Sequence, residues 1–467
     1  MTKPIDFSQY FTEETKRRGE SPLKALLKYM LADPQLISLG GGLPNPSLFP
    51  FNSVTAEVVS PGSNPAQNLE PLTVTVDRYA KKDSVTEPLS TLLQYGGGVG
   101  AKSMIDFIYQ HMKDVHNPKY EGWGVISSVG STDSLNKAIE IFATAGDSII
   151  VCEWSYPSAI ETFTASGLKM APVKMDGEGM IPEDLDLVCS NWTEARPPRL
   201  VYLIPTGQNP TGATMSVSRR HEFYKVCQKH DLIVIEDDPY YFLQFADAPV
   251  VSAEEETDEY FAKLPGTKNL MPSILSIDTD GRVLRLDTVS KILAPNMRQG
   301  WVTGQSALIK RIQYHNETTI QQPCGFTQGI ASKLLNEVWG HEGFLKHLLS
   351  LQYEYISRRN AIMYAIQQNL GNMVSYTVPV GGMFVWLKVN LPEDIRSKPG
   401  IMEEVFQSMI ENQVMLVPGW QFSPATDQTP VKDAPYFRAA FSFASKEELT
   451  TAIERLAIAL ARFGCKK

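Results

Sequence analysis

The chain has 467 residues, a formal net charge of −9, and a composition that is 43% hydrophobic and 20% charged. These values predict a globular protein with two domains, and the negative charge gives no electrostatic support for a nucleic-acid partner. No apolar run approaches the roughly 20 residues of a membrane-spanning helix, so we expect no membrane partner.

The five cysteines and seven histidines predict neither disulfides nor a bound metal. The cysteines are scattered, odd in number and without a CxxC pair, and the histidines lack the close spacing of metal ligands. The N-terminal residues include Asp6, Glu13 and Glu14 and contain no apolar secretory stretch, which is unlike a transit or signal peptide. We therefore expect a cytoplasmic protein.

The N-terminal region is predicted to be an arm followed by irregular structure. Residues 1–20 are polar, residues 22–31 carry leucines at helical spacing, and the glycines of 40–44 end that short helix. Residues 51–90 are polar with several prolines, which predicts an irregular surface excursion. We assign residues 1–94 to this arm and to part of a small domain.

From about residue 95 the pattern changes to short apolar strands that alternate with helices. The predicted strands are 148–152, 200–205, 232–236, 283–287 and 301–303, and the predicted helices are 135–142 and 219–230. Continuous apolar strands separated by helices are typical of a parallel sheet covered on both faces. Residues 95–345 are therefore predicted to form a large domain, which an acidic surface loop at 246–272 interrupts.

The C-terminal region is predicted to be a smaller α+β domain at residues 346–467. A long helical pattern covers 344–370, and a final helix is predicted at 446–463. Between them, two short strands are predicted at 382–388 and 414–417.

Polar residues of different chemistry follow the predicted strands. Asn209 and Asp237 stand at two strand ends, with Tyr240 three residues after Asp237. Lys291 follows a third strand, and Arg298 comes seven residues later. A lone lysine is usually a solvated surface residue, but this ordered set is what pyridoxal phosphate requires. An amine forms a Schiff base with its aldehyde, an acid pairs with its ring nitrogen, and hydrogen bonds hold its phenolate oxygen.

The choice of acid and phenol stays open at this level. Glu236, Asp237 and Asp238 are consecutive, so strand alternation does not decide which of them faces the cofactor. Asp237 is favoured because its spacing from Tyr240 lets an acid and a phenol flank one ring, and Tyr241 is the rival phenol.

Asn209 lies in a tight turn closed by proline and glycine. Those residues aim its amide, although an asparagine in a turn is often only a turn residue. Asp237 follows 28 residues later, which is one crossover unit, so both side chains can meet at neighbouring strand ends.

A phosphate seat is predicted at the start of the helix that covers 135–142. Ser131 and Thr132 precede this helix, whose first N–H groups can bind an anion, and helix capping is the plainer interpretation. Thr288, Ser290 and Arg298 can complete the seat, since a guanidinium adds charge and a planar fork.

Three further residues are candidates for contact with the cofactor ring or the substrate. Tyr156 is preferred over Trp154 for stacking on the ring, with ordinary aromatic packing as the alternative. Arg438 stands among apolar neighbours, where a substrate carboxylate or an internal salt bridge would satisfy its charge.

The chain resembles the fold type I pyridoxal-phosphate enzymes, and among them the class I/II aminotransferases. The segments that carry the resemblance are 39–44, 48–50, 204–212, 236–242 and 290–295. They are similar to the kynurenine/2-aminoadipate aminotransferase branch, and the excursions at 51–90 and 246–272 are similar to the fungal aromatic and 2-aminoadipate aminotransferases. The resemblance implies an α/β fold, with a mostly parallel seven-stranded sheet covered by helices, plus the smaller α+β domain.

The resemblance also implies a role for each candidate residue. Lys291 is the lysine bound to the cofactor, Asp237 meets the ring nitrogen, and Asn209 and Tyr240 meet the phenolate oxygen. The phosphate region is assigned Ser131, Thr132, Thr288, Ser290 and Arg298. Arg438 takes the substrate carboxylate, Gly41 and Asn209 lie near the substrate, and Tyr95 reaches the cofactor site of the partner subunit.

The expected protein is a homodimeric aminotransferase with shared active sites. It would exchange amino groups between aromatic amino acids or 2-aminoadipate and 2-oxoglutarate/glutamate by a ping-pong cycle. The alternatives are a lyase or decarboxylase on the same scaffold and an aminotransferase-like regulator. Three positions depart from the family pattern and bear on the phosphate loop, namely Thr288, Asn296 and Gln299.

Overall fold

The computed structural model describes residues 1–26, 29, 32–33, 35–37, 39–40, 42–63, 70–194, 196–424 and 431–467. The chain forms two compact units, each assembled from three segments. The first unit contains Met1–Thr144, Leu232–Pro239 and Pro272–Leu348. The second contains Ala145–Asp231, Tyr240–Met271 and Leu349–Lys467. The division into domains at 94/95 and 345/346 stays a prediction.

The main sheet has seven strands in the order β3-β11-β10-β9-β8-β4-β5. Their bounds are β3 (Trp123–Ser128), β11 (Gly300–Gln305), β10 (Val283–Thr288), β9 (Ile233–Asp237), β8 (Leu200–Leu203), β4 (Ser148–Cys152) and β5 (Lys169–Val173). β9 is parallel to β10, and β4 is parallel to both β5 and β8. Only β11 runs antiparallel to the two strands beside it, β10 and β3. The predicted mostly parallel seven-stranded sheet is confirmed.

The five strands predicted in this sheet are those with continuous apolar runs. β4, β8, β9, β10 and β11 are buried along their whole length, which is why their apolar residues follow one another without regular alternation. The charged residues of β9 and β10 are buried as well. β3 and β5 were not predicted, and they are the two edge strands. β5 contains Pro172, which an edge strand tolerates because one side of its backbone needs no partner.

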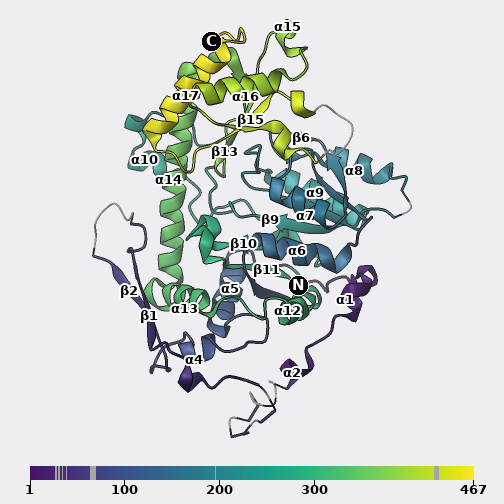
Figure 1. The fold of residues 1–467 in the computed structure, drawn as a ribbon, viewed down its shortest axis with the longest axis vertical. Coiled ribbons are helices and arrows are strands. Elements are labelled where there is room, and N and C mark those ends of the chain that lie inside the picture. Colours follow the sequence, from purple (N-terminus) through teal and green to yellow (C-terminus); the bar gives the residue numbers. More distant parts are fainter. Residues whose placement is uncertain are drawn as a thin grey trace. The chain divides into compact units, whose positions relative to one another are not determined.

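The first unit also contains a two-stranded ladder near the N-terminus, drawn in dark blue and purple in Figure 1. β1 (Ser53–Val58) pairs antiparallel with β2 (Leu72–Asp77), so the prediction of irregular structure throughout 51–90 is wrong for these residues. The residues of β1 alternate between exposed and half-buried. That alternation of β-branched and polar residues was the strand signal, and the flanking prolines concealed it.

The helices of the first unit come from the first and third of its segments. They are α1 (Glu13–Arg17), α2 (Pro22–Ala25), α4 (Leu89–Leu92), α5 (Lys102–Val115), α6 (Ser131–Phe142), α11 (Ile274–Ile277), α12 (Ser306–Thr318) and α13 (Gly325–Lys333). The helix predicted at 22–31 is present as α2, and several of its later residues lie outside the described part of the chain.

The second unit adds a four-stranded antiparallel sheet, with the order β12-β13-β15-β14. The bounds are β12 (Val374–Ser375), β13 (Phe384–Val389), β15 (Tyr436–Ala440) and β14 (Val417–Pro418). A small hairpin joins β6 (Met175–Asp176) to β7 (Gly179–Met180). The helices are α7 (Pro157–Ala165), α8 (Pro182–Ser190), α9 (Val217–Lys229), α10 (Asp258–Phe261), α15 (Glu393–Arg396), α16 (Ile401–Glu411) and α17 (Lys446–Ala461).

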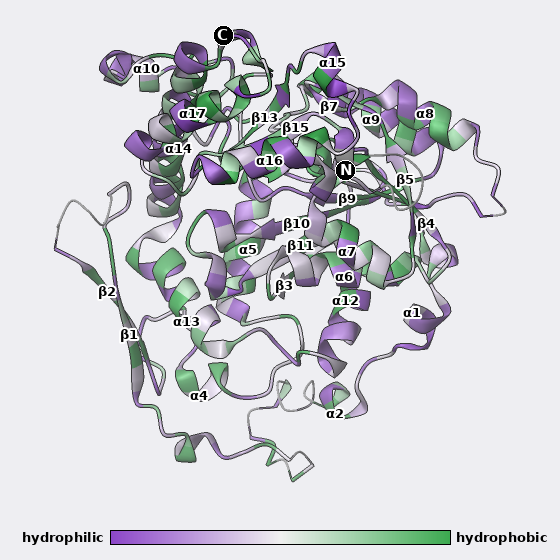
Figure 2. Ribbon diagram, turned by 45° about the horizontal axis from the view of Figure 1, so that its top comes forward, coloured by the Kyte–Doolittle hydropathy of each residue, from purple (hydrophilic) through white to green (hydrophobic). Residues whose placement is uncertain are grey.

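The amphipathic pattern of the C-terminal helices explains why they pack on this unit. Figure 2 shows hydrophilic and hydrophobic residues alternating along α16 and α17. One face of α17 is buried, with Leu449, Ile453 and Leu456 following one another at helical spacing. Ser445 and Glu448 form a capping box that begins the helix.

The longest helix is α14 (Gly340–Asn369), which the sequence predicted at 344–370. The boundary between the two units falls inside it, after Leu348. None of the helices described combines the length and apolarity needed to cross a membrane.

Candidate active-site residues

The three consecutive acids predicted at the end of β9 point to different surroundings. Glu236 and Asp238 both contact the guanidinium of Arg285 on β10, each at 3.1 Å. Arg285 also reaches Asp287 at 2.9 Å, and the Arg285 and Glu236 side chains are inaccessible to solvent. We call these four residues the Arg285 network. Because side chains alternate along a strand, Asp237 projects to the face opposite its two neighbours.

Burial governs the charges in the Arg285 network. The carboxylate of Glu236 also accepts the backbone N–H groups of Ile274 and Leu275, at 2.8 and 3.1 Å. Burial raises the pKa of Asp287, and the neighbouring guanidinium of Arg285 opposes that shift. One arginine therefore serves three buried carboxyl groups, which fixes the end of β9 where Asp237 stands.

Lys291 lies where the sequence placed it, directly after β10. It ends a short 3-10 helix, Val289–Lys291, that begins when the Thr288 side chain accepts the N–H of Ser290. The next residue, Ile292, accepts a hydrogen bond of 2.8 Å from Nε2 of His347 on α14. The lysine residue is half-buried.

The start of α6 has the form of an anion seat. Gly130 is the N-cap residue, and no side chain caps the helix, so its first N–H groups are available. The Oγ atom of Ser131 is buried and has no hydrogen-bond partner among the described residues. Thr132 is exposed beside it. A buried hydroxyl without a partner at a helix N-terminus fits a bound phosphate.

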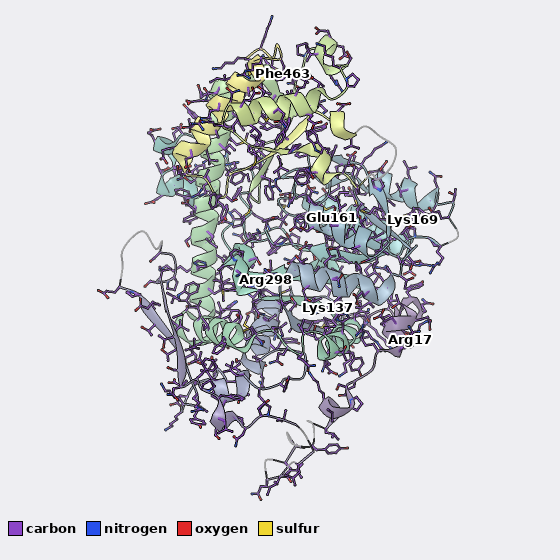
Figure 3. The ribbon with its side chains drawn as sticks, in the orientation of Figure 1. Arg17, Lys137, Glu161, Lys169, Arg298 and Phe463 are labelled. Atoms are coloured by element: carbon purple, nitrogen blue, oxygen red, sulfur yellow. The ribbon has the colours of Figure 1, made fainter. Side chains whose placement is uncertain are left out.

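Arg298, labelled in Figure 3, adds positive charge to this seat. Its Nη2 atom donates to the carbonyl of Val129 at 2.8 Å, and its Nη1 atom lies 3.5 Å from Oγ of Ser290. The approach depends on Gly130, because a Cβ there would lie 2.1 Å from Arg298 Nη2. The Ser290 hydroxyl is 2.7 Å from that of Thr288. The structure thus brings all five predicted phosphate residues together within one unit.

Two departures from the family pattern have different consequences. Gln299 is fully buried and donates to the Gly300 carbonyl at 3.0 Å, so it supports β11 and is not part of the seat. Asn296 is exposed in the short 3-10 helix Pro295–Met297.

In the second unit, Arg438 and Asn209 form a pair. Nη1 of Arg438 donates to Oδ1 of Asn209 at 2.7 Å. The guanidinium carbon lies 4.5 Å from the ring centre of Phe384 and 5.0 Å from that of Phe422. No carboxylate of the described residues pairs with Arg438, and its buried Nε atom has no hydrogen-bond partner there. The arrangement favours an external carboxylate over an internal salt bridge.

Two predicted phenols lie in the surroundings of Arg438. Burial lowers the pKa of this arginine, and the nearby Tyr240 and Tyr156 act in the opposite direction. Tyr240 is 4% exposed and packs edge-on against Phe384, with ring centres 5.7 Å apart. The rival Tyr241 packs edge-on against the neighbouring Phe242 instead.

The loop that carries Asn209 is tied down by its own neighbours. Gln208 donates to the carbonyl of Trp154 at 2.7 Å and accepts the N–H of Thr211 at 2.8 Å. Arg220 on α9 is fully buried and donates to the carbonyls of Met215 and Pro205, at 3.0 and 3.2 Å. Gly207 allows a close backbone approach, because a Cβ there would lie 2.3 Å from the Cα of Gly382.

The remaining predicted residues have simpler outcomes. Trp154 lies against Trp386 and Tyr436, with ring centres 5.5 Å from each. Tyr95 is 60% exposed. Gly41 lies outside the described residues.

The sequence analysis did not identify Arg285, Gln208 and Arg220. Their hydrogen bonds and ion pairs fix the backbone segments that carry the candidate residues. The signal for Arg285 was an arginine inside the buried strand β10, which needs acidic partners on the strand beside it. The acids at 236 and 238 have the matching two-residue period. Arg220 gave no comparable signal, because the helix that carries it is mostly polar.

The chain matches the family Aminotransferase class I and II over residues 62–456. It is 39% identical to an aromatic amino acid aminotransferase of Schizosaccharomyces pombe, with 97% of this chain and 98% of the relative covered. It is 31% identical to the mitochondrial kynurenine/alpha-aminoadipate aminotransferase of Bos taurus, covering 97% and 98%. The crystal structure of aminotransferase Aro8 from Candida albicans superposes with a TM-score of 0.91 at 34% identity, covering 99% and 100%. The chain belongs to the class I and II aminotransferases, which are pyridoxal-phosphate enzymes, and the resemblance carried by its motifs is confirmed.

Proposed function

We propose that this aminotransferase exchanges the amino group of aromatic amino acids or 2-aminoadipate with 2-oxoglutarate/glutamate in a ping-pong cycle. The observation that carries the proposal is the pair formed by Arg438 and Asn209 beside the rings of Phe384 and Phe422. A guanidinium with an unfilled donor suits a carboxylate, and the rings around it suit an aromatic side chain. The names of the relatives from Schizosaccharomyces pombe and Bos taurus accord with both donor classes.

Pyridoxal phosphate fits the residues that we propose should hold it. The partnerless hydroxyl of Ser131, the open N–H groups of α6 and the guanidinium of Arg298 would bind its phosphate, together with Thr132, Thr288 and Ser290. When bound, this cofactor withdraws electrons from the substrate Cα, which makes the Cα proton acidic.

The other proposed roles follow from the chemistry of each side chain. Asp237 is proposed to keep a proton on the ring nitrogen, since Glu236 and Asp238 are already engaged by Arg285. Asn209 and Tyr240 are proposed to donate to the phenolate oxygen, and Tyr156 to contact the ring. The amine of Lys291 is proposed to bind the cofactor and to take the Cα proton from the amino acid.

A panel of amino donors with 2-oxoglutarate tests the proposed substrates. We expect phenylalanine, tyrosine, tryptophan, kynurenine or 2-aminoadipate to give the highest kcat/KM, with initial-rate lines that are parallel at several 2-oxoglutarate concentrations. Alanine or aspartate as the preferred donor would contradict the proposal. Release of carbon dioxide or ammonia in place of an oxo acid would indicate a decarboxylase or lyase.

We further propose a homodimer in which Tyr95 reaches the cofactor site of the partner subunit. Its support is the exposure of Tyr95 and of other apolar side chains of the first unit, such as Leu48 at 80% and Phe51 at 43%. Sedimentation at micromolar concentration should give a dimer, and a monomer with full activity would contradict the proposal.

A cytoplasmic location is also part of the proposal. The five cysteines are all free thiols, which accords with a reducing compartment. Fractionation of cells that express the tagged full chain tests it, and recovery in an organelle fraction would overturn it.

A further inference from the structure

A cavity of about 770 Å³ lies within the second unit, apart from the residues assigned to the reaction. Its wall includes Trp154, Trp386 and Tyr436, and neither Asn209 nor Arg438 lines it. We call this space the aromatic cavity. Its volume is within the roughly 300–1,000 Å³ typical of small-molecule sites.

The three rings that name the cavity are packed on one another and only half-buried. Trp386 and Tyr436 are stacked with their ring planes 8° apart and their centres 5.3 Å apart. Trp154 is tilted by 55° and 53° from them, at 5.5 Å from each. A planar apolar ligand would cover ring surface that otherwise faces water, which is favourable at about 25 cal/mol per Å².

Two groups of opposite charge accompany the rings. Glu153 has one oxygen bound by the N–H of Met175 at 2.8 Å, and its carboxylate has no other protein donor among the described residues. Lys388 lies opposite Tyr436 in the ladder between β13 and β15, and its ammonium group has neither an ion pair nor a hydrogen bond within the described part of the chain. Burial raises the pKa of Glu153, and the hydrogen bond from the N–H of Met175 opposes that shift.

Two other acids of the cavity wall already have partners, and a third, Asp247, is exposed to solvent. Asp176 pairs with Arg219 at 2.8 Å, and Glu178 accepts the hydroxyl of Ser216 at 2.6 Å. The charged groups left for a ligand are therefore the half-buried carboxylate of Glu153, the exposed carboxylate of Asp247 and the ammonium group of Lys388, beside a set of ring faces. We assign Glu153 to the ligand because it is the less exposed acid and adjoins Trp154 in the chain. An aromatic amino acid presents the complementary chemistry, an ammonium group, a carboxylate and a planar side chain.

We propose that the aromatic cavity binds a free aromatic amino acid as an effector. Its ring lies against Trp154 and Trp386, its ammonium group faces Glu153, and its carboxylate faces Lys388. The choice of an aromatic amino acid rests in part on the proposed function, because an enzyme of this substrate class meets such molecules at both sites.

The sheet connects the aromatic cavity to Arg438. Trp386 stands directly opposite Arg438 in the ladder, and Tyr436 is two residues before it on the same strand face. The ring of Phe422 contacts both Trp386, at 5.7 Å, and the guanidinium of Arg438, at 5.0 Å. An occupant that reorients Trp386 therefore alters the setting of Arg438, and changes KM for the amino donor more than kcat.

Equilibrium dialysis of the holoenzyme with labelled L-phenylalanine tests the proposal. The enzyme is first reduced with borohydride, so that its active site no longer exchanges amino groups. We expect the reduced wild-type enzyme to bind phenylalanine. The Lys388→Met and Glu153→Gln variants should bind it about tenfold more weakly. Lys398→Met, which removes an exposed lysine outside the cavity, should bind like the wild type.

Two analogues show which end of the ligand meets which residue. Phenethylamine lacks the carboxylate and 3-phenylpropionate lacks the ammonium group, so each should bind the wild type more weakly than phenylalanine. Lys388→Met should abolish the difference in affinity between phenylalanine and phenethylamine. Glu153→Gln should abolish the difference in affinity between phenylalanine and 3-phenylpropionate. The ratio of two dissociation constants is measured for the same variant. A substitution that weakens the binding of all ligands equally, by destabilising the protein, therefore leaves this ratio unchanged.

The outcomes separate this proposal from the proposed function. Absence of phenylalanine binding at millimolar concentration, or equal binding by Lys388→Met and Lys398→Met, would overturn the effector site. Loss of binding in Arg438→Lys with retention in Lys388→Met would place the ligand at the substrate arginine, and would equally overturn it. The dialysis uses inactive enzyme, so failure of the donor panel alone leaves the cavity result standing.

Discussion

Arg285 in the first unit and Arg438 in the second have opposite surroundings. In the first unit, Arg285 forms ion pairs with the carboxyl groups of Glu236, Asp238 and Asp287, so its charge is balanced within the protein. In the second unit, Arg438 has one amide partner, Asn209, and two aromatic rings, while its Nε atom has no partner among the described residues.

The difference separates a structural charge from a functional one. A buried charge with a full set of partners holds the backbone in place, whereas a partly buried charge without a counter-ion is costly unless a ligand supplies one. We infer that the Arg285 network orients Asp237 before any ligand arrives, and that Arg438 is completed only when a substrate carboxylate binds.

Asp237→Asn should show the largest effect on the reaction if the Arg285 network serves that residue. An amide does not hold the proton on the ring nitrogen, so kcat should fall at least about a hundredfold. Asp238→Asn is the matched control, and should lose stability more than rate because Asp238 faces Arg285. Steady-state kinetics of both variants decide the matter, and a mild Asp237→Asn with a crippled Asp238→Asn would mean that the other acid serves the cofactor.

Arg285→Met tests whether the stability of the protein depends on the ion pairs of Arg285. Removing the guanidinium leaves buried carboxyl groups without their cation, so the free energy of unfolding should fall by about 3–5 kcal/mol. Arg462→Met removes an exposed arginine that pairs with Glu411, and should cost less than about 1 kcal/mol. Urea denaturation at one fixed protein concentration measures both changes, and equal effects would contradict the structural role of Arg285.

Arg438→Lys sharpens the other side of the comparison. A lysine keeps the charge and loses the planar fork, so KM should rise about tenfold or more for the amino donor and for 2-oxoglutarate alike. Both co-substrates are expected to use the same carboxylate seat in successive half-reactions. The same change at Arg455, which donates to the Gln413 carbonyl, should leave both KM values unaltered. A rise confined to one co-substrate would make Arg438 a side-chain reader or a structural residue.

His111 offers a smaller test of how closed the first unit is. Burial, the charge of His341 and that of Arg285 lower the pKa of this fully buried imidazole to about 3. The folded pKa is below the unfolded value, so its contribution to stability is complete above about pH 6.5 and is lost as the pH falls towards 3. The free energy of unfolding should therefore decline between pH 6.5 and 5, by up to about 1.4 kcal/mol per pH unit from this group.

The control for His111 is a histidine already in contact with water. His111→Phe should flatten the decline between pH 6.5 and 5, because the unfolded variant has one proton fewer to take up. His221→Asn, at an exposed position, should leave the slope unchanged. The same slope in wild type and His111→Phe would show that His111 is not shielded.

The central strands were predictable because burial on both faces leaves a continuous apolar run. β4, β8, β9, β10 and β11 carry that signal, while the edge strands β3 and β5 do not. β1 and β2 were missed because their alternation lies among prolines and polar residues. The four-stranded sheet was predicted only in part. β15, which carries Arg438, is short, and its polar and apolar residues do not form the pattern of a strand.

The sequence predicted which functional groups stand at the strand ends. It did not predict which of several neighbouring residues supplies each group. An arginine inside β10 indicates that acidic partners are needed, but only the structure identifies Glu236 and Asp238 as those partners, because the three residues are up to 49 positions apart. The partnerless hydroxyl of Ser131 and the open side of Arg438 are likewise properties of packing. The aromatic cavity had no sequence signal, since its residues come from separate segments of the second unit.

The most direct measurement is borohydride reduction of the purified enzyme followed by peptide mapping. We propose that the cofactor is bound to Lys291, which follows β10 beside the phosphate seat. We expect a yellow protein in which reduction fixes the cofactor to the peptide that contains Lys291, and a Lys291→Ala variant that forms no such adduct. Attachment to another lysine, or no attachment, would contradict the account.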